Sequence, residues 1–212
     1  MARFADLLVT DGATRGLIGP REGPRLWSRH LVNCVALVPL LPDRGAVIDL
    51  GAGAGLPGIV VAAMRPDLVV ELVEPMERRV EWLREVVEDL DLGGVVVTRA
   101  RAEELRGRRD ADAVMARAVA PLGRLAAWGA PLLKHGGLLL ALKGRGARGE
   151  VEAARNELHG CSLVDAEVLT LRPLPGIEPT YVVRARAGSV SRETRAVQRS
   201  RYHRQAAPKT RA

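Results

Sequence analysis

Three glycines at alternate positions, Gly51, Gly53 and Gly55, follow an apolar run that contains Asp49, within the stretch AVIDLGAGAGLPG. Glycine lets a backbone pass close to a ligand and adopt positive φ angles. Counted from Gly53, the stretch is the G-x-G-x-x-G motif of a dinucleotide site, whereas from Asp49 it is the D-x-G-x-G-x-G loop of an S-adenosylmethionine site. The first site would serve hydride transfer and the second methyl transfer.

The residues around these glycines favour S-adenosylmethionine. A dinucleotide site offers free N–H groups at a helix N-terminus to pyrophosphate, whereas Pro57 has no N–H and the Asp49 carboxylate would repel a pyrophosphate. That carboxylate suits a ligand with an ammonium and a sulfonium group, which it can bind directly or through water. Glu74 ends the next apolar run, 19 residues after Gly55, where an acid binds the ribose hydroxyls of either cofactor.

Two further turns carry candidate ligand-binding residues. The turn Arg101-Ala102-Glu103-Glu104 follows the third apolar run, where a backbone N–H and an acid can read the edge of an adenine. The same acids also suit the first turn of a helix, and the two roles are compatible. Arg117 ends the fourth run. We expect it at the cleft beside the transferred methyl group; the alternative is a surface arginine.

Apolar runs alternate with helical segments along the chain. The strand-like runs are AVIDL (46–50), VVELVE (69–74), VVVT (95–98), AVMAR (113–117), LLLALK (138–143), LVDAEVLTL and TYVVRAR. This alternation predicts an α/β fold with a doubly wound, mostly parallel, seven-stranded sheet. The last two runs flank a proline-rich turn and predict a terminal antiparallel hairpin. In such a sheet the ligand binds at the carboxyl ends of the strands.

The predicted helices pack around this sheet. Pro57 and Pro121 each open a helix, and the segment 78–90 places four apolar residues on one face, Val80, Leu83, Val87 and Leu90. Ahead of the first strand, RLWSRHLVNCVALVPLL reads as an amphipathic helix in a region, about 1–42, that could cover the site.

The length of the chain and the distribution of its charges indicate the domain organisation. We expect one methyltransferase domain over 1–187, followed by a basic, disordered tail over 188–212 that carries seven Lys or Arg and one acid. Such a tail either neutralises phosphate or only improves solubility. Cys34 and Cys161 have neither disulfide nor zinc spacing, so two buried thiols and no metal site are expected. No membrane span and no secretory signal is recognisable, which predicts a cytoplasmic protein.

Together, these residues resemble the GidB/RsmG family, the bacterial small-subunit rRNA guanine-N7 methyltransferases. The matching stretches run in order through about residues 20–186: Arg29-His30-Leu-Val-Asn33-Cys34, DLGAGAGLPG, Glu74-Pro-Met-Glu-Arg78-Arg79-Val, Arg101-Ala-Glu-Glu104, Ala116-Arg117-Ala118 and Leu142-Lys143-Gly144. The LPG ending of the glycine loop is more specific than its glycines. Asn33 departs from the family, since many members carry Asp there, and we assign it no acid–base role.

The resemblance implies a class I, Rossmann-like methyltransferase fold and S-adenosyl-L-methionine as cofactor. Gly51 and Leu56 would hold the cofactor, Glu74 its ribose, Ala102 and Glu103 the adenine side, and Arg117 the methionine end or the target base. The partner implied is 16S rRNA or the 30S ribosomal subunit. The residues implied to line the RNA approach are Arg29, His30, Arg78, Arg79, Lys143 and Arg145, although His30 could equally be a helix histidine with its hydrogen bonds satisfied.

Guanine N7 has an exposed lone pair and loses no proton on methylation. The reaction therefore needs no general base and no nucleophile, only alignment of the nitrogen with the sulfonium methyl, and we assign catalysis to proximity, with Arg117 near the methyl and His30 a candidate. The sequence lacks the Asn-Pro-Pro-aromatic run of exocyclic-amine methyltransferases and the Pro-Cys of carbon-five cytosine enzymes. Aromatic residues make up 3% of the chain, so RNA recognition should depend on shape and phosphate.

Two other classes of function remain open from the sequence. An NAD-dependent oxidoreductase would bind NAD at the glycine loop, and a non-catalytic RNA-binding protein would use the basic tail without a cofactor. We expect a monomer.

Overall fold

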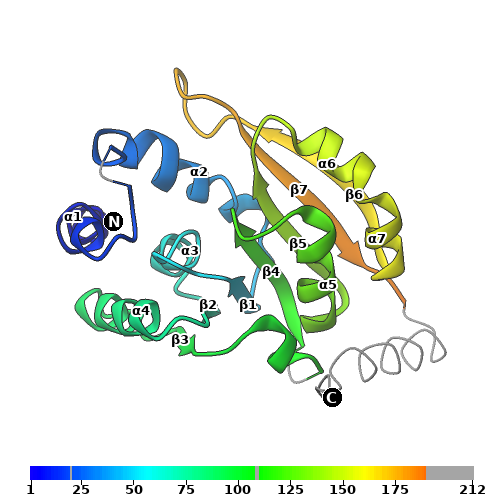
Figure 1. Cartoon of the computed structure of the whole chain (residues 1–212), viewed down its shortest axis with the longest axis horizontal. Helices are drawn as coiled ribbons and strands as arrows, with labels where there is room; N and C mark the ends of the chain where they lie inside the picture. Colours follow the sequence, from blue (N-terminus) through cyan, green and yellow to red (C-terminus); the bar gives the residue numbers. More distant parts are fainter. Residues whose placement is uncertain (20, 108–109, 190–212) are drawn as a thin grey trace, which may run out of the picture.

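The computed structural model describes residues 1–19, 21–107 and 110–189. Its centre is a seven-stranded sheet in the order β3-β2-β1-β4-β5-β7-β6 (Figure 1). The strands are β1 (Gly45–Leu50), β2 (Leu68–Val73), β3 (Val95–Thr98), β4 (Ala111–Arg117), β5 (Leu133–Lys143), β6 (Leu163–Leu171) and β7 (Thr180–Ala187). The first five are parallel, and β7 is antiparallel to both β5 and β6. The predicted sheet with its terminal hairpin is confirmed.

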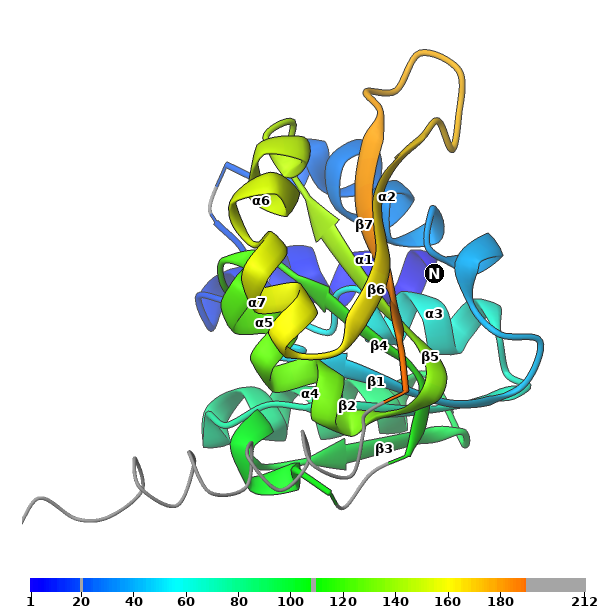
Figure 2. The same ribbon diagram turned by 90° about the vertical axis from the view of Figure 1, so that its right-hand side faces the viewer.

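Helices cover both faces of the sheet (Figures 1 and 2). One face packs against α1 (Ala2–Leu7), α2 (Val32–Val35), α3 (Gly58–Met64) and α4 (Glu77–Asp89), and the other against α5 (Leu122–Gly129), α6 (Ala147–Ala153) and α7 (Arg155–Gly160). Short 3-10 or π-helical turns are η1 (Leu8–Gly12), η2 (Gly23–Arg25), η3 (Leu26–Leu31), η4 (Val38–Leu40), η5 (Ala102–Leu105) and η6 (Ala130–Leu132).

The central strands are apolar on both sides because each side faces a helical layer. In β1, Val47 faces the core shared with α3 and the N-terminal helices, whereas Ile48 faces the core shared with α5. Both side chains are buried. Helices α3 and α5 begin directly after Pro57 and Pro121, as predicted. Strand β1 lies in the middle of the sheet. The glycine loop, which follows it, therefore lies at the carboxyl ends of the central parallel strands.

The N-terminal region differs from the single covering helix that the sequence suggested. It forms two helical stretches, α1–η1 and η2–η3–α2, and the chain between them passes Gly16 at φ +67. The first stretch buries Phe4 and Leu8, and the second buries Leu26 and Leu31. We call residues 1–35 the covering segment. Among the thiols, Cys34 is buried and Cys161 is partly exposed.

The packing face of α4 also differs from the predicted one. Val80 and Leu83 are buried as expected, together with Trp82 and Val86, whereas Val87 and Leu90 are only partly buried. The difference arises because the covering segment packs against this helix. Ion pairs Arg3–Asp89 and Arg15–Glu85 and the cation–π contact of Arg15 with Trp82 join the two. The predicted tail lies outside the described residues beyond Ser189.

The two edges of the sheet are unlike each other. β3 has four residues, and Val96 on it and Val69 on β2 are both about half exposed. β6 has nine residues, and its register with β7 shifts between Val164 and Glu167, where Asp165 has φ +53.

Candidate functional site

A cavity of about 450 Å³ lies at the carboxyl ends of β1, β2 and β4. Four separate parts of the chain line it: the covering segment, the glycine loop, the turn after β2 and the turn after β4. The lining residues are Leu17, Ile18, Gly19, Glu22, His30, Gly51, Ala52, Gly53, Ala54, Leu56, Glu74, Pro75, Met76, Arg79, Arg117, Ala118 and Val119. The cavity therefore lies at the carboxyl ends of the strands, where the sequence predicts that a ligand binds.

The glycine loop needs its glycines for two different reasons. A Cβ on Gly51 would lie 2.9 Å from Val119 Cγ2, and one on Gly55 would lie 2.6 Å from Ile59 Cγ1. At Gly53 a Cβ would make only an ordinary contact, 3.8 Å from the Gly51 carbonyl oxygen, but the φ of +55 is one that L residues rarely adopt. The N–H groups of Gly51 and Ala52 both donate to the carbonyl of Val73, which fixes the loop to the end of β2.

Asp49 lies beneath this loop and is fully buried. The N–H of Gly58, at the start of α3, donates to its Oδ2 at 2.7 Å, whereas its Oδ1 is buried with no hydrogen-bond partner. Burial raises the pKa of Asp49 to about 7, against the lowering effects of the Gly58 N–H and of Arg117. Because Gly58 gives its N–H to this carboxylate, that amide at the start of α3 is not available to a pyrophosphate.

Glu74 is the second buried acid of the site, with an exposed fraction of 2%. Its Oε2 accepts the Gly53 N–H at 3.0 Å, its Oε1 accepts the Met76 N–H at 3.0 Å, and Arg79 Nη1 lies 3.8 Å away. Each carboxylate oxygen has two lone pairs, so Glu74 can accept further hydroxyl donors from the cavity. It connects the glycine loop to the turn after β2.

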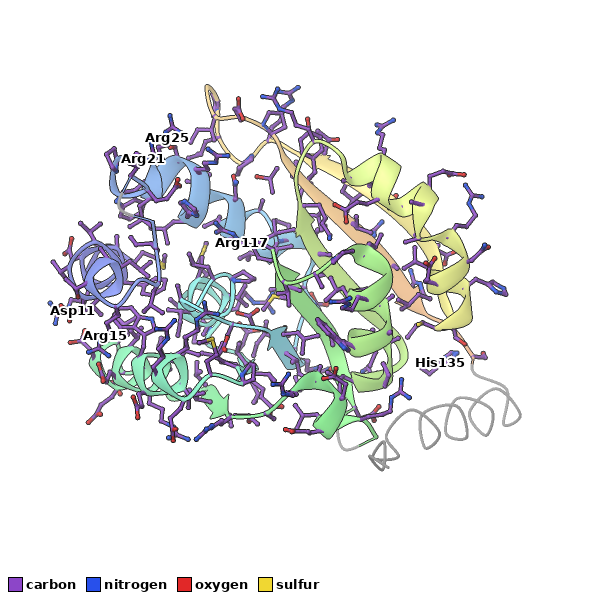
Figure 3. All side chains as sticks on the ribbon, in the orientation of Figure 1. Asp11, Arg15, Arg21, Arg25, Arg117 and His135 are labelled. Atoms are coloured by element: carbon purple, nitrogen blue, oxygen red, sulfur yellow. The ribbon has the colours of Figure 1, made fainter. Side chains whose placement is uncertain are left out.

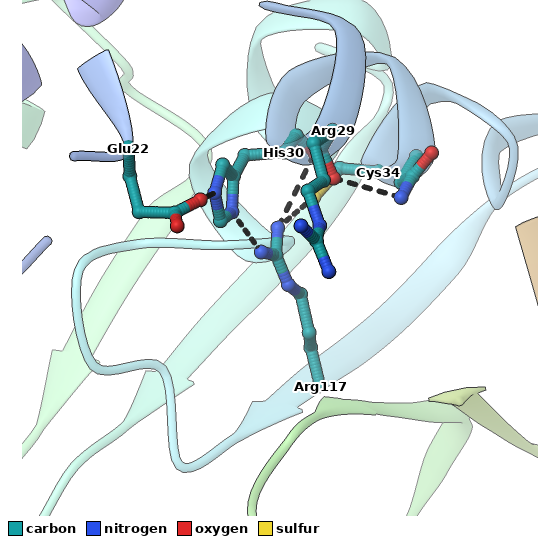
Figure 4. Close-up of polar contacts among 6 residues, drawn as sticks. Glu22, Arg29, His30, Cys34 and Arg117 are labelled. Carbon is teal, nitrogen blue, oxygen red and sulfur yellow. Dashed lines mark hydrogen bonds and ion pairs between the residues drawn. The ribbon is translucent and has the colours of Figure 1, made fainter. Parts of the chain in front are cut away.

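Arg117 projects from the end of β4 into the middle of the molecule (Figure 3). One guanidinium nitrogen donates to the carbonyl of His30 at 3.3 Å and lies 3.5 Å from Cys34 Sγ, and the other contacts His30 Nδ1. On its far side, His30 Nε2 lies 2.5 Å from Glu22 Oε2 (Figure 4). Burial lowers the pKa of His30 and raises the pKa of Cys34 to about 11.

Glu22 is a member of the site that the sequence did not indicate. It carries no spacing signal, being a single acid in a loop of the covering segment, and only the fold brings it to His30. The predicted adenine-side residues Ala102 and Glu103 lie on η5 and do not line the cavity, and neither do Gly55 and Asp49.

The residues expected to line the RNA approach are in different environments. Arg29 and Arg78 are exposed and make no ion pair within the described chain. Arg79 lines the cavity beside Glu74, and Arg145 pairs with Glu178 at 2.7 Å.

The environment of Lys143 differs from the expected one. Its Nζ donates to the carbonyl of Ala120 at 2.9 Å and to Glu150 Oε2 at 2.7 Å, with the side chain only 9% exposed. We therefore assign Lys143 to support of the turn after β4 rather than to phosphate contact. In the ranges that the structure describes, no three His, Cys, Asp or Glu residues are grouped to hold a metal ion, and no helix is long and apolar enough for a membrane span.

Comparisons with known proteins identify the family of the chain. The family model of GidB, described as rRNA small subunit methyltransferase G, matches residues 1–174. A Beutenbergia cavernae protein named ribosomal RNA small subunit methyltransferase G is 53% identical over 184 residues, 87% of each chain. A Thermobifida fusca protein of the same name is 58% identical over 156 residues, 74% of this chain and 66% of that one.

Solved structures share the fold at lower identity. A SAM-dependent O-methyltransferase from Thermotoga maritima has a TM-score of 0.61 and 17% identity, with 89% of this chain and 72% of that chain covered. TYW2 of M. jannaschii, in complex with AdoMet, has a TM-score of 0.61 and 20% identity, with 78% of each chain covered. The fold is thus that of class I S-adenosylmethionine-dependent methyltransferases, and the family match extends over most of the sequence. The chain therefore belongs to the GidB family of rRNA small subunit methyltransferases.

Proposed function

We propose that this protein transfers a methyl group from S-adenosylmethionine to N7 of a specific guanine in the 16S rRNA of the small ribosomal subunit. Its family supports the rRNA methyltransferase activity. The structural observation that carries the choice of cofactor is the buried Asp49 carboxylate beneath the glycine loop, with one oxygen unpartnered. A buried carboxylate of this kind favours a cationic ligand and disfavours a pyrophosphate.

The residues present fit S-adenosylmethionine. Gly51 and Leu56 line the cavity and would hold the cofactor along the glycine loop, and Glu74 would accept its ribose hydroxyls. Asp49 does not line the cavity, so its negative charge would attract the cationic part of the cofactor from beneath the glycine loop without touching it. Ala102 and Glu103 would meet the adenine beyond the cavity. When bound, the cofactor supplies an electrophilic methyl group on a sulfonium.

The protein's own part in the reaction is to align and to exclude water. Guanine N7 attacks with its lone pair and releases no proton, so no base is required. His30 would not serve as a base in any case, because both of its ring nitrogens are engaged, by Glu22 and by Arg117. Arg117 would orient the methionine end or the guanine, and in-line placement within about 3 Å accounts for the rate.

The RNA would approach across the covering segment and the start of α4. Arg21, Arg25, Arg29 and Arg78 are exposed there, without ion pairs among the described residues (Figure 3 labels the first two). Trp27 is 51% exposed on the same segment and offers a flat surface to a base. We place the enzyme in the cytoplasm as a monomer, with naked 16S rRNA or the 30S subunit as substrate.

Transfer of label from methyl-tritiated S-adenosylmethionine tests this function. Small-subunit rRNA or 30S particles lacking the mark should be labelled once per molecule, and mass spectrometry of nuclease fragments should locate the methyl on N7 of a single guanine. Absence of transfer to both substrates would contradict the proposal. S-adenosylhomocysteine should raise the melting temperature and NAD should not, which separates this function from an oxidoreductase and from a cofactor-free RNA-binding protein.

A further inference from the structure

The side chains of Glu22, His30 and Arg117, which we call the clasp, meet at the cavity and bridge two distant parts of the chain. Glu22 and His30 belong to the covering segment, and Arg117 ends β4, 87 positions after His30. All three line the cavity (Figure 4). The clasp therefore joins the covering segment to the sheet at the place where the methyl donor would bind.

The chemistry of the three groups dictates where the protons lie. A guanidinium can only donate, so His30 Nδ1 must accept from Arg117, and an ionised carboxylate can only accept, so His30 Nε2 must carry the proton that it gives to Glu22. The clasp thus holds a neutral imidazole in its Nε2–H tautomer. A second proton on Nδ1 would place two donors face to face and break the contact with Arg117.

The surroundings of His30 favour this neutral form. Burial, Arg117 and Arg29 all lower the pKa of its imidazole, while Glu22 raises it, and the sum lies below the ordinary value. Of the other charged groups nearby, Glu74 and Arg79 at the cavity are paired with each other, and Asp49, whose pKa is raised to about 7 beneath the glycine loop, interacts with Arg117. The clasp is therefore intact at neutral pH and opens in acid.

We propose that Glu22 is a positioning residue for methyl transfer. It acts through His30 to hold the Arg117 guanidinium at the cavity, and protonation of His30 releases that guanidinium. The inference rests on the proposed function. It adds Glu22 to the site, although Glu22 does not contact Arg117 directly. It also requires His30 to be neutral, so that His30 accepts a hydrogen bond rather than acting as a base.

Two variants test the role of Glu22. Glu22→Ala removes the acceptor and should lower kcat by about 10- to 100-fold, because a misplaced orienting group costs that much, while the melting temperature and the KM for rRNA change little. Glu22→Gln keeps an acceptor oxygen for Nε2–H and should restore most of kcat at pH 7.5. Glu85→Gln breaks the ion pair between the covering segment and α4 outside the cavity and should leave kcat unchanged.

The dependence of kcat on pH distinguishes a positioning role of Glu22 from a merely structural one. Because the Glu22 carboxylate raises the pKa of His30, Glu22→Gln should shift the acid limb of kcat to lower pH. A variant that only destabilised the fold would shift it to higher pH. An unshifted limb, or full activity in Glu22→Ala, would overturn the proposal.

Nitrogen-15 NMR of the imidazole rings provides a measurement that is independent of activity. His30, one of four histidines, should show the Nε2–H tautomer in the wild type and a lower pKa in Glu22→Gln. An Nδ1–H tautomer would refute the clasp even in an active enzyme. If the wild type transfers no methyl group while the NMR results hold, the proposed function fails and the clasp stands as a structural element only.

Discussion

Replacing Asp49 by asparagine should stabilise the protein and weaken its binding of the methyl donor. In the unfolded chain the carboxyl titrates at its ordinary pKa of 3.8, whereas burial raises the pKa to about 7 in the fold. Relative to high pH, protonation of Asp49 therefore stabilises the fold. This stabilisation is complete below pH 3.8, and it is lost as the pH rises through about 7. At about 1.4 kcal/mol per pH unit between the two pKa values, the ionised group costs about 4 kcal/mol at pH 8.

Asparagine at this position stays neutral at every pH and can still accept the Gly58 N–H. The free energy of unfolding of Asp49→Asn, measured by urea titration, should therefore exceed that of the wild type by up to about 4 kcal/mol at pH 8, and the difference should vanish near pH 4. Binding of S-adenosylmethionine, measured by calorimetry at pH 8, should weaken roughly tenfold, because the negative charge beneath the glycine loop that attracts the cationic part of the cofactor is lost.

Asp112 supplies the matched control. Lys134 and the N–H of Ala46 hold the pKa of its carboxyl below the ordinary value, so its contribution is present above that value and is lost in acid. Asp112→Asn should accordingly lower the free energy of unfolding at pH 8 and leave cofactor binding unchanged. A destabilised Asp49→Asn at pH 8, or a difference from wild type that does not vary with pH, would refute the assignment of an unpartnered buried carboxylate.

Three further predictions concern the loops and the RNA surface. Gly51→Ala places a Cβ 2.9 Å from Val119 on a backbone at φ +75 and should lower the free energy of unfolding by about 1–3 kcal/mol and weaken cofactor binding in calorimetry, whereas Gly149→Ala, which has open space, should do neither. Lys143→Met should slow methyl transfer and leave the salt dependence of RNA binding unchanged; a slope smaller by about one would mean that Lys143 contacts a phosphate after all. Trp27→Ala should weaken RNA binding by about 1–3 kcal/mol in filter binding, with S-adenosylhomocysteine binding unaffected and Trp27→Phe retaining most of the affinity.

The sheet and the glycine loop after its first strand were predictable from the sequence because local patterns determine them. Continuous apolar runs such as AVMAR (113–117) predict buried strands between two helical layers, and β4 occupies that run within Ala111–Arg117. The charge of Asp49 and the missing N–H of Pro57 favoured S-adenosylmethionine over a dinucleotide without knowledge of the fold. By contrast, the sequence predicted no element over 147–160, where α6 and α7 lie, because that segment has few apolar residues to show a helical period.

The clasp and the support of the turn after β4 were not predictable, because they depend on contacts between distant segments. Lys143 was expected to bind phosphate because it lies in a basic, glycine-rich stretch. Its actual partners are a carbonyl in the turn after β4 and Glu150 on α6. The spacing of residues along the chain indicates neither partner, and the sequence alone does not show whether a lysine is buried or exposed.

The two unlike edges of the sheet bear on how easily two copies of the protein would join edge to edge. An edge strand offers unpaired N–H and C=O groups to a strand of another molecule. β3 carries half-exposed Val96 but has only four residues, so an intruding strand would gain few hydrogen bonds. β6 is long enough to recruit a partner, and its irregular register beside Asp165 and Glu167 makes it a poor template. Extending β3 by a few residues would therefore promote aggregation more than the same insertion beside β6.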